Sequence, residues 1–371
     1  MSRTVLPEKV KIRLWGKASG RCQYEGCNKP LWYDSTTKSE FNSAYIAHIV
    51  ADSPDGPRGD KNRSELLSKE IKNLMLLCDT HHRMIDRDQV DEHPEEILLE
   101  MKKRHEERME MLTSLTEEKQ SYVLLYGANI GKNGAKVSME KAIHAMLPEK
   151  YPADKMGIEL GLKSSMFNDK EQMYWAMEAE NLKRQFKEKV SQRSEIGLNH
   201  MSVFALAPQP LLIELGRLLS DIQTAEVYQL NREPCDWKWQ ETQSEEFEYR
   251  LVPPDTITNI VALNISLSAT IDNSRIRDVL GNDVSIWTLT IDNPYNDFLK
   301  SKEQLRLFRE MFRKSMNQIK SLHGHNNELH LFPAAPVSIA VEVGRAWMPK
   351  ADLPLKIYDE NKGFNLVWSI D

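Results

Sequence analysis

Four residues near the N-terminus have the types and spacing of a structural zinc site. Cys22 and Cys27 are separated by four residues, and Cys78 and His81 are separated by two. Thiolates and an imidazole are the usual ligands of tetrahedral zinc, and two such pairs would join two turns of the chain. The alternative is that these cysteines are buried free thiols. We predict a zinc site, because three of the four cysteines in the chain lie in these pairs.

A second set of polar residues, His48, Asn73, His82 and Asp86, lies between and just after these pairs. Phosphodiester hydrolysis needs a water that loses its proton near neutral pH, and His48 could be the general base. His82 and Asp86 are spaced i and i+4, so both would lie on one face of a helix and could bind Mg²⁺ or another divalent cation. Asn73 is expected to hold a loop and orient His48. Taken singly, these residues would be a core histidine, a turn residue and solvated helix residues.

Together these segments resemble the HNH, or ββα-metal, nuclease family. The resemblance covers about 70 residues and is carried by AHIV at 47–50, KNLMLLC at 72–78 and HHRMID at 81–86. In that family a strand carries the histidine base, a loop carries an asparagine and a helix carries metal ligands. The resemblance implies an α+β ββα-metal nuclease domain over 1–115, with structural Zn²⁺, a catalytic divalent cation, and His48, Asn73 and His82 in catalytic roles.

One position departs from the family pattern. The family often has Asp or His directly before the base, as a further metal ligand, and this chain has Ala47. Asp52 or Asp60 could replace that ligand. The site could instead be weakened, or be completed only when DNA or another subunit arrives.

The charge of the chain is unevenly distributed. The net charge is −6, yet residues 1–90 carry 15 Lys and Arg against 12 Asp and Glu. This segment could face a polyanion, with Arg58, Lys61 and Arg63 in the loop after the base clamping DNA phosphates. A solvated loop is the alternative. No base-reading module is visible, so we expect little sequence specificity.

The remainder of the chain predicts a second domain over 121–371, joined by a linker over 116–120. In the first domain we expect helices over 7–19 and 94–118, a strand over 44–50, and a turn leading into a helix over 72–86. In the second we expect helices over 137–147, 169–193, 210–221 and 301–322, and strands over 121–131, 201–207, 225–230, 260–271, 284–291 and 337–343. This alternation predicts parallel α/β units, and its two similar halves could be a diverged duplication.

Long segments of this second domain resemble the SAVED domain, a sensor of bacterial antiphage systems built from two CARF-like, Rossmann-like halves. They are HMSVFALAPQPLLIELGRLLSD at 200–221, VYQLNREPCDWKW at 227–239, HLFPAAPVSIAVEVGRAWMPKADLPLKIYD at 330–359 and the terminal GFNLVWSID. The resemblance implies binding of a cyclic di- or trinucleotide made by a partner CD-NTase nucleotidyltransferase. It also implies homo-oligomerisation on binding and activation of a fused effector. HNH joined to SAVED resembles the CBASS effector nucleases, which degrade double-stranded DNA in abortive infection.

Three turns could contact such a ligand, because ligands of parallel α/β units sit at the carboxyl ends of strands. Aromatic faces would stack on bases, and basic side chains or backbone N–H groups would hold phosphates. For any single tryptophan, core packing is the alternative. The candidate ligand-binding residues are Pro208, Gln209, Arg232, Trp237, Lys238, Trp239, Phe332, Pro333, Ala334 and Ala335.

Other functions stay open at this stage. The chain could be a restriction-type HNH nuclease whose second domain recognises specific or modified DNA, although residues 91–371 are acidic overall. It could also be a zinc-binding module that has lost catalysis, and RNA remains a possible substrate. The absence of a long apolar run and of a signal sequence predicts a cytoplasmic protein with no membrane partner.

Overall fold

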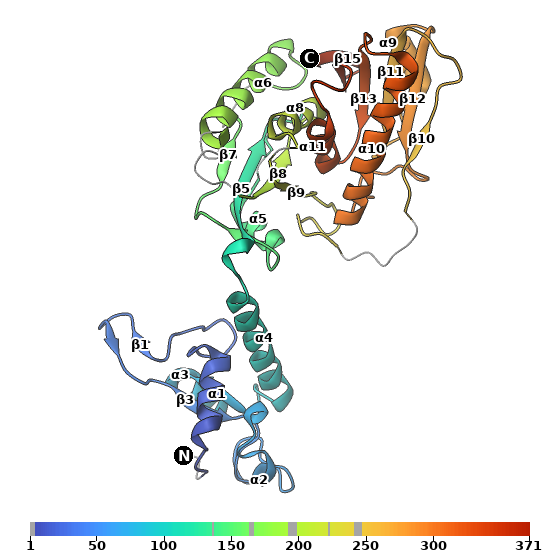
Figure 1. Ribbon diagram of the computed structural model, residues 1–371. Helices are drawn as coiled ribbons and strands as arrows, with labels where there is room; N and C mark the ends of the chain where they lie inside the picture. The colour runs from blue at the N-terminus through green and yellow to red at the C-terminus, as the bar shows by residue number, and fades with distance from the viewer. Residues whose placement is uncertain (1–3, 136, 163–166, 192–198, 222, 241–246) are drawn as a thin grey trace. The chain divides into compact units, whose positions relative to one another are not determined.

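The chain folds into two compact units, Met1–Thr116 and Glu117–Asp371, each with its own internal contacts. The computed structural model describes residues 4–135, 137–162, 167–191, 199–221, 223–240 and 247–371, and Figure 1 draws their helices and strands. None of the helices in these ranges is long and apolar enough to cross a membrane.

The first unit is built around a two-stranded antiparallel sheet, β3 with β4, and the helix that follows it. Tyr45 pairs with Leu77 and His48 pairs with Leu74. β4 was expected to be a turn, but all four of its residues, LMLL, are buried. The elements of this unit are α1 (Glu8–Ala18), β1 (Tyr33–Asp34), β2 (Ser39–Glu40), β3 (Tyr45–His48), α2 (Ser64–Leu67), η1 (Ile71–Asn73), β4 (Leu74–Leu77), α3 (Asp79–Arg83), the π-helical η2 (Met84–Asp88) and α4 (Glu95–Thr113).

The first sheet of the second unit has strand order β6-β5-β8-β9, and β7 also pairs with β5. All of its strand pairs are parallel, as the alternation of strands and helices predicts. Its elements are η3 (Glu117–Lys119), β5 (Gln120–Gly127), α5 (Met139–Met146), β6 (Tyr151–Pro152), β7 (Ile158–Leu160), α6 (Gln172–Phe186), η4 (Lys187–Ser191), β8 (Met201–Leu206), α8 (Gln209–Leu219) and β9 (Ala225–Val227). The last two residues of the helix expected over 169–193 lie outside the described residues.

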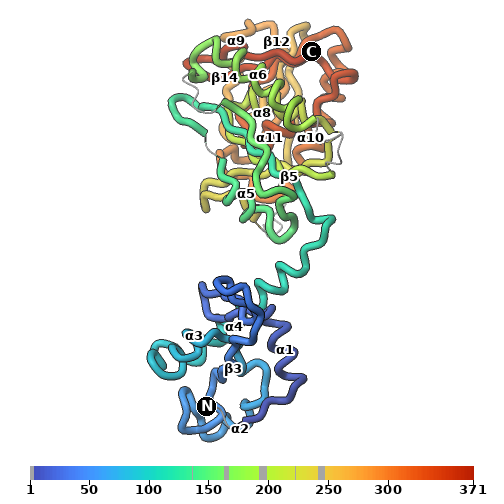
Figure 2. The backbone as a smooth tube through the Cα atoms, turned by 90° about the vertical axis from the view of Figure 1, so that its left-hand side faces the viewer, coloured from blue at the N-terminus to red at the C-terminus, as the bar shows by residue number. Residues whose placement is uncertain are grey.

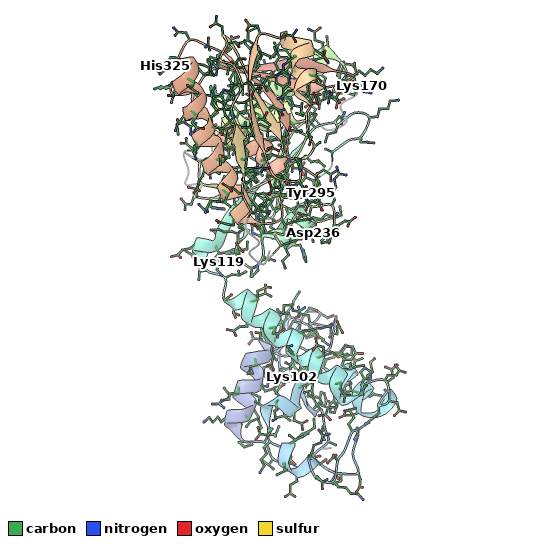
Figure 3. The ribbon with its side chains drawn as sticks, turned by 90° about the vertical axis from the view of Figure 1, so that its right-hand side faces the viewer. Lys102, Lys119, Lys170, Asp236, Tyr295 and His325 are labelled. Carbon is green, nitrogen blue, oxygen red and sulfur yellow. The ribbon has the colours of Figure 1, made fainter. Side chains whose placement is uncertain are left out.

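The second sheet has strand order β10-β12-β11-β13-β14-β15. Its four central strands are parallel, and both edge strands, β10 and β15, are antiparallel to their neighbours. Its elements are β10 (Arg250–Val252), β11 (Ile260–Ser266), α9 (Asn273–Leu280), β12 (Val284–Thr290), α10 (Lys302–His323), β13 (Leu329–Ala334), α11 (Val337–Ala346), β14 (Leu355–Glu360) and β15 (Phe364–Ile370). His325, just after α10, and Tyr295, before it, lie at opposite ends of this unit, so α10 runs along it (Figure 3).

The strand expected over 337–343 is wrong, because this segment is the helix α11. A short apolar run of β-branched residues does not by itself distinguish a buried strand from a buried helix. Here nine of the ten helical residues are buried, so no polar face reveals the helical period. Pro336 precedes the helix at its N-cap, where the missing N–H costs nothing.

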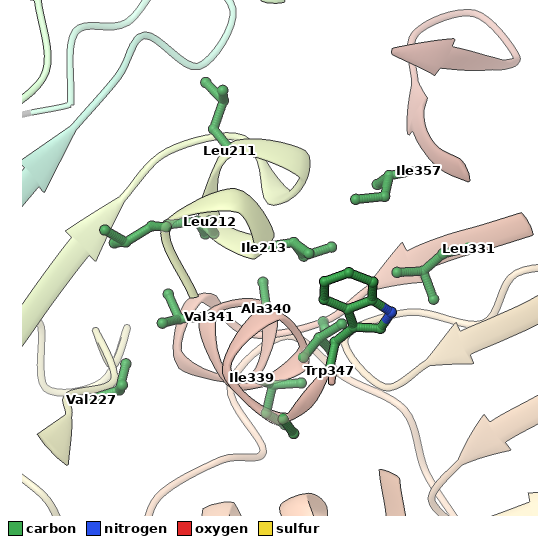
Figure 4. Packing of buried hydrophobic residues seen from close by; sticks show 14 of the residues in the cluster. Leu211, Leu212, Ile213, Val227, Leu331, Ile339, Ala340, Val341, Trp347 and Ile357 are labelled. Atoms are coloured by element: carbon green, nitrogen blue, oxygen red, sulfur yellow. The ribbon is translucent and has the colours of Figure 1, made fainter. Parts of the chain in front are cut away.

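Helices α8 and α11 cross at backbone contact in the centre of the second unit (Figures 1 and 2). A Cβ atom on Gly216 would lie 1.9 Å from the carbonyl oxygen of Val341, and one on Gly344 would lie 1.9 Å from that of Ile213. The crossing carries matching sequences, IELGR at 213–217 and VEVGR at 341–345. Ile213, Ala340 and Val341 pack between the helices (Figure 4). The two sheets are therefore joined through two equivalent helices that require glycine where they cross.

The crossing predicts that Gly216→Ala destabilises the second unit. The added methyl group would overlap backbone that cannot rotate away, at a cost of about 1–3 kcal/mol or more. Gly16→Ala is the matched control, because Gly16 is also helical and a Cβ there meets nothing within 4 Å. That change should be neutral or stabilising by up to about 1 kcal/mol. Urea unfolding followed by tryptophan fluorescence measures both, and an unchanged midpoint for Gly216→Ala would contradict the prediction.

Candidate functional site

The four predicted zinc ligands come together in the first unit. Their ligand atoms all lie within 4.8 Å of one another, and this is the only group of three or more metal donors within the described ranges. The Nδ1 atom of His81 lies 3.2 Å from Sγ of Cys78 and 3.6 Å from Sγ of Cys22. Cys22 and Cys27 come from the loop after α1, whereas Cys78 and His81 open α3.

The chemistry of this cluster fits a zinc ion. The pKa of Cys22 is raised to about 12, mainly by burial and in part by the neighbouring Cys78 and Cys27. Three thiolates at this spacing would repel one another, and a divalent cation would stabilise them. Burial also lowers the pKa of His81, which keeps the imidazole neutral, as a metal ligand must be. Cys22, Cys27, Cys78 and His81 would therefore hold Zn²⁺ as a structural staple.

Two residues that the sequence analysis did not identify fix the ring of His81. The ring of Tyr24 stacks on it, with centroids 4.0 Å apart and planes 1° from parallel. The hydroxyl of Tyr24 lies 3.0 Å from Nε2 of His93, and Nδ1 of His93 donates to the carbonyl of Gln89 at 2.7 Å. Neither Tyr24 nor His93 has a spacing that marks a metal site, so only the fold reveals this support.

The candidate base, His48, is a buried residue at the end of β3. Its Nε2 atom lies 2.9 Å from the carbonyl oxygen of Ser68. Because a carbonyl oxygen only accepts hydrogen bonds, Nε2 carries the proton, and a neutral ring keeps its lone pair on Nδ1. Nδ1 is thus the nitrogen that could accept a proton from water.

Asn73 binds the chain just after His48. Its Oδ1 accepts from the backbone N–H of Val50 and its Nδ2 donates to the Val50 carbonyl, both at 2.8 Å, while Nδ2 also donates to Leu67 at 3.2 Å. The amide therefore holds the loop, as expected. These bonds act on the backbone that follows His48 and not on its imidazole.

The candidate cation ligands lie one helical turn apart, with Nε2 of His82 3.3 Å from Oδ2 of Asp86. Two donor atoms at this separation could share one cation at about 2.1 Å from each. Burial lowers the pKa of His82, which favours the neutral ring that a metal requires. The donor set is small, however. Among the residues that the structure describes, no third His, Cys, Asp or Glu joins His82 and Asp86 in a cluster of possible metal ligands.

The structure does not directly join the candidate base to this pair. The ring of His82 stacks on Tyr45, with centroids 4.9 Å apart. Tyr45 opens β3 and His48 ends it, and side chains three positions apart on a regular strand point to opposite faces. The contacts of His82 with Tyr45 and Asp86 therefore do not reach the imidazole of His48.

The three expected phosphate contacts have different surroundings. The side chain of Arg58 is only 9% exposed and its guanidinium is bound to Ile49, Ile85 and Asp86, so it differs from the expected DNA clamp. Arg63 donates to both oxygens of Glu95, at 3.0 and 2.7 Å. Lys61 is exposed, as a phosphate contact would have to be.

Two of the candidate ligand residues, Lys238 and Trp239, line a cavity of about 1080 Å³ in the second unit. Tyr228, Phe247, Tyr295 and Phe298 provide further aromatic walls. Tyr295 and Asp236 lie at the same end of this unit (Figure 3). The cavity thus combines base-stacking surfaces with an exposed lysine, the combination that nucleotide sites use.

Several of the other candidates differ from expectation because they serve the fold. Trp237 is buried edge-on against Phe204, and Phe332 is buried against Tyr358 and Phe364. Pro333 and Ala334 belong to β13, which replaces the expected turn. Pro208 lies at the N-cap position of α8, and Gln209 begins that helix and accepts from the backbone of Ala335. The backbone of Arg232 donates to Asp297.

Zinc binding can be tested with two cysteine variants. We expect about one zinc per chain in the wild type, and its loss in Cys27→Ser, because three donors hold the ion much less tightly. Cys235→Ser is the matched control, since Cys235 is exposed and outside the cluster. Elemental analysis measures the metal content. Zinc retained in full by Cys27→Ser, or absent from the wild type, would contradict the assignment.

Comparison with known proteins identifies the second unit. The family model of the SMODS-associated and fused to various effectors sensor domain, SAVED, matches residues 182–370. No curated protein matches the chain.

Solved structures with similar folds include Cap4 SAVED/CARF-domain receptors. One from Acinetobacter baumannii is 12% identical with a TM-score of 0.43 and covers 76% of this chain and 60% of its own. The same receptor with the cyclic trinucleotide 2'3'3'-cAAA is 13% identical, with a TM-score of 0.43 and coverages of 74% and 60%. The Moraxella osloensis receptor is 14% identical, with a TM-score of 0.39 and coverages of 75% and 59%. This chain therefore spans about 60% of the length of the first receptors. Because the SAVED model matches more than half of its residues, the chain belongs to the SAVED sensor-domain family.

Proposed function

We propose that this protein is a cyclic-oligonucleotide-activated, metal-dependent endonuclease of CBASS antiphage defence. The SAVED region would bind the activator, and the first unit would cut double-stranded DNA with little sequence specificity. The proposal rests on one observation above all. A SAVED region shares its chain with a unit that holds a Cys3His cluster, a buried histidine on a short strand and a His–Asp pair on the next helix.

The activator would be a cyclic di- or trinucleotide. An Acinetobacter baumannii Cap4 receptor has been solved with 2'3'3'-cAAA and with 3'3'3'-cAAA. In this chain, Trp239 would stack on a base and Lys238 would contact a phosphate. Lys300 and Lys302 also line the cavity but are paired with carboxylates, Lys300 with Asp297 and Lys302 with Glu149 and Glu226. A ligand phosphate would have to compete with these carboxylates.

The hydrolytic step would depend on His48. Its proton on Nε2 is held by the Ser68 carbonyl, so Nδ1 would accept the proton of the attacking water. His82 and Asp86 would hold the divalent cation, which supplies positive charge to the phosphate and to the departing oxygen. Ligand-driven homo-oligomerisation would couple the two units, because a ligand shifts an equilibrium toward the state that it binds better.

A second candidate is a zinc-stapled binding module without catalysis. Two observations favour it. Ala47 stands where the family often has a metal ligand, and among the described residues only His82 and Asp86 are placed to hold the catalytic cation. This module would bind zinc and the cyclic nucleotide but would leave DNA intact.

Plasmid cutting tests the nuclease directly. The full chain would be incubated with plasmid, Mg²⁺ and a panel of cyclic di- and trinucleotides. We expect cutting only with an activating ligand, and a loss of about 10²–10⁴-fold in His48→Ala, the contribution typical of a general base. His325→Ala is the control, because His325 is exposed and lies in the second unit. Wild-type rates in His48→Ala would exclude its catalytic role, and equal cutting without any ligand would exclude activation.

Ligand binding tests the cavity. For a cyclic trinucleotide that binds the wild type, we expect Trp239→Ala to raise Kd by about tenfold or more, because stacking on one base contributes about 1–3 kcal/mol. Arg277→Ala is the control, since this exposed side chain does not line the cavity and is not a candidate ligand residue. Calorimetry measures both affinities. An unchanged Kd in Trp239→Ala would show that the ligand binds elsewhere.

A further inference from the structure

Arg58 connects two segments of the first unit that carry different parts of the candidate site. Its Nε donates to the carbonyl of Ile49 at 2.7 Å, and its Nη1 donates to the carbonyl of Ile85 at 2.7 Å. Its Nη2 donates to Oδ1 of Asp86 at 2.9 Å. Ile49 follows the candidate base, and Asp86 is a candidate cation ligand. One planar guanidinium therefore joins the segment just after β3 to η2, the helical segment that contains Ile85 and Asp86.

The loop that carries Arg58 is folded tightly upon itself. A Cβ on Gly59 would lie 2.3 Å from the carbonyl oxygen of Pro54, and one on Gly56 would lie 2.6 Å from Cβ of Ala51. Arg58 itself has φ of +56°. A non-glycine residue in this region costs about 1 kcal/mol or more and persists only where surrounding contacts compensate. The three hydrogen bonds of the guanidinium supply that compensation.

Arg58 and Asn73 together bind every backbone polar group of the two residues after His48. Ile49 donates to the Asn73 carbonyl at 2.8 Å and accepts from Arg58. Val50 donates to and accepts from the Asn73 side chain. The position of this segment is therefore set by Arg58 and Asn73, of which only Asn73 was expected from the sequence to hold the loop.

Arg58 also decides which oxygen of Asp86 remains for other partners. Because Oδ1 is held by the guanidinium, Oδ2 faces Nε2 of His82 at 3.3 Å. The side chain of Asp86 is 25% exposed, whereas that of Arg58 is 9% exposed. The carboxylate of Asp86 thus keeps one fixed oxygen, Oδ2, for the cation that Asp86 and His82 would hold together.

We propose that Arg58 is a positioning residue of the cation site. It fixes the carboxylate of Asp86 and, through the Ile49 carbonyl, ties it to the segment that carries His48. A lysine could not replace it, because an ammonium group lacks the planar fork that reaches three acceptors at once. The inference rests on the proposed function, since that function assigns the cation to His82 and Asp86.

The test measures Mn²⁺ affinity of the full chain by electron paramagnetic resonance, which reads binding without requiring DNA cutting. Residues that orient metal ligands commonly change metal affinity 10- to 100-fold. We therefore expect Arg58→Met to weaken Mn²⁺ binding by about 10- to 100-fold and Arg58→Lys to restore at most part of it. The matched control is Arg104→Met, which removes an arginine of the same unit that pairs with Glu100 and Glu25. Its Mn²⁺ affinity should stay within about twofold of the wild type.

A double-mutant cycle separates positioning from general destabilisation. If Arg58 acts through the carboxylate, Arg58→Met should change affinity by less than about twofold in an Asp86→Asn background. If the loss of Mn²⁺ affinity in the double variant equals the product of the losses in the two single variants, Arg58 and Asp86 act independently. This result would overturn the proposal. Zinc content confirms folding, and if Arg58→Met loses its zinc, the same cycle with Arg58→Lys decides.

The remaining outcomes distinguish this inference from the proposed function. A wild type that binds Mn²⁺ and cuts plasmid, with unchanged Mn²⁺ affinity in Arg58→Met, would overturn the role of Arg58 and leave the nuclease standing. A wild type that binds no Mn²⁺ would overturn both the positioning role and the assignment of the cation to His82 and Asp86.

Discussion

The gathering of three thiols and one imidazole within 4.8 Å is the constraint on which the first unit depends. The regular elements that it joins are short: β3 and β4 have four residues each, and α3 has five. Such elements bury little surface and rarely hold their positions alone. A cation among Cys22, Cys27, Cys78 and His81 would tie the loop after α1 to the start of α3. His82 lies on α3 itself, and His48 lies on β3, which pairs with β4, the strand that leads into Cys78.

The second unit meets a different constraint, which is the close crossing of α8 and α11. Gly216 and Gly344 allow backbone to touch backbone, and beside each glycine a buried glutamate pairs with an arginine: Glu214 with the half-buried Arg217, and Glu342 with the buried Arg345. Buried charges are costly unless they are paired, and these glutamates also pair with Lys183 of α6 and Arg309 of α10. Because α8 follows β8 and α11 follows β13, this crossing links the packing of the two sheets.

Local chemistry was easier to predict from sequence than long-range placement. The Cys3His cluster could be predicted because its spacing and residue types are rare together. α11 could not, since a buried helix without a polar face has no readable period. The hydrogen bonds of Arg58 could not be predicted either, because loop arginines are usually solvated and only the fold brings Ile49 and Asp86 within its reach. Trp237 and Phe332 have aromatic rings that could stack on a base, but both rings are buried in the core.

The relation between His48 and the His82–Asp86 pair is the part of the account that depends most on geometry. The guanidinium of Arg58 binds both the Ile49 carbonyl, just after His48, and the carboxylate of Asp86, while the imidazoles of His48 and His82 contact Ser68 and Tyr45. Binding of a cation or DNA could bring His48 closer to the His82–Asp86 pair, because catalytic contacts often tighten only when substrate is bound.

Anomalous diffraction from crystals of the full chain grown with Mn²⁺ is the most direct measurement. The account predicts a zinc peak among Cys22, Cys27, Cys78 and His81. It also predicts a manganese peak bound by His82 and Asp86, with Nδ1 of His48 no farther away than one bridging water. A manganese peak elsewhere, or a His48 ring turned away from that cation, would contradict the nuclease assignment.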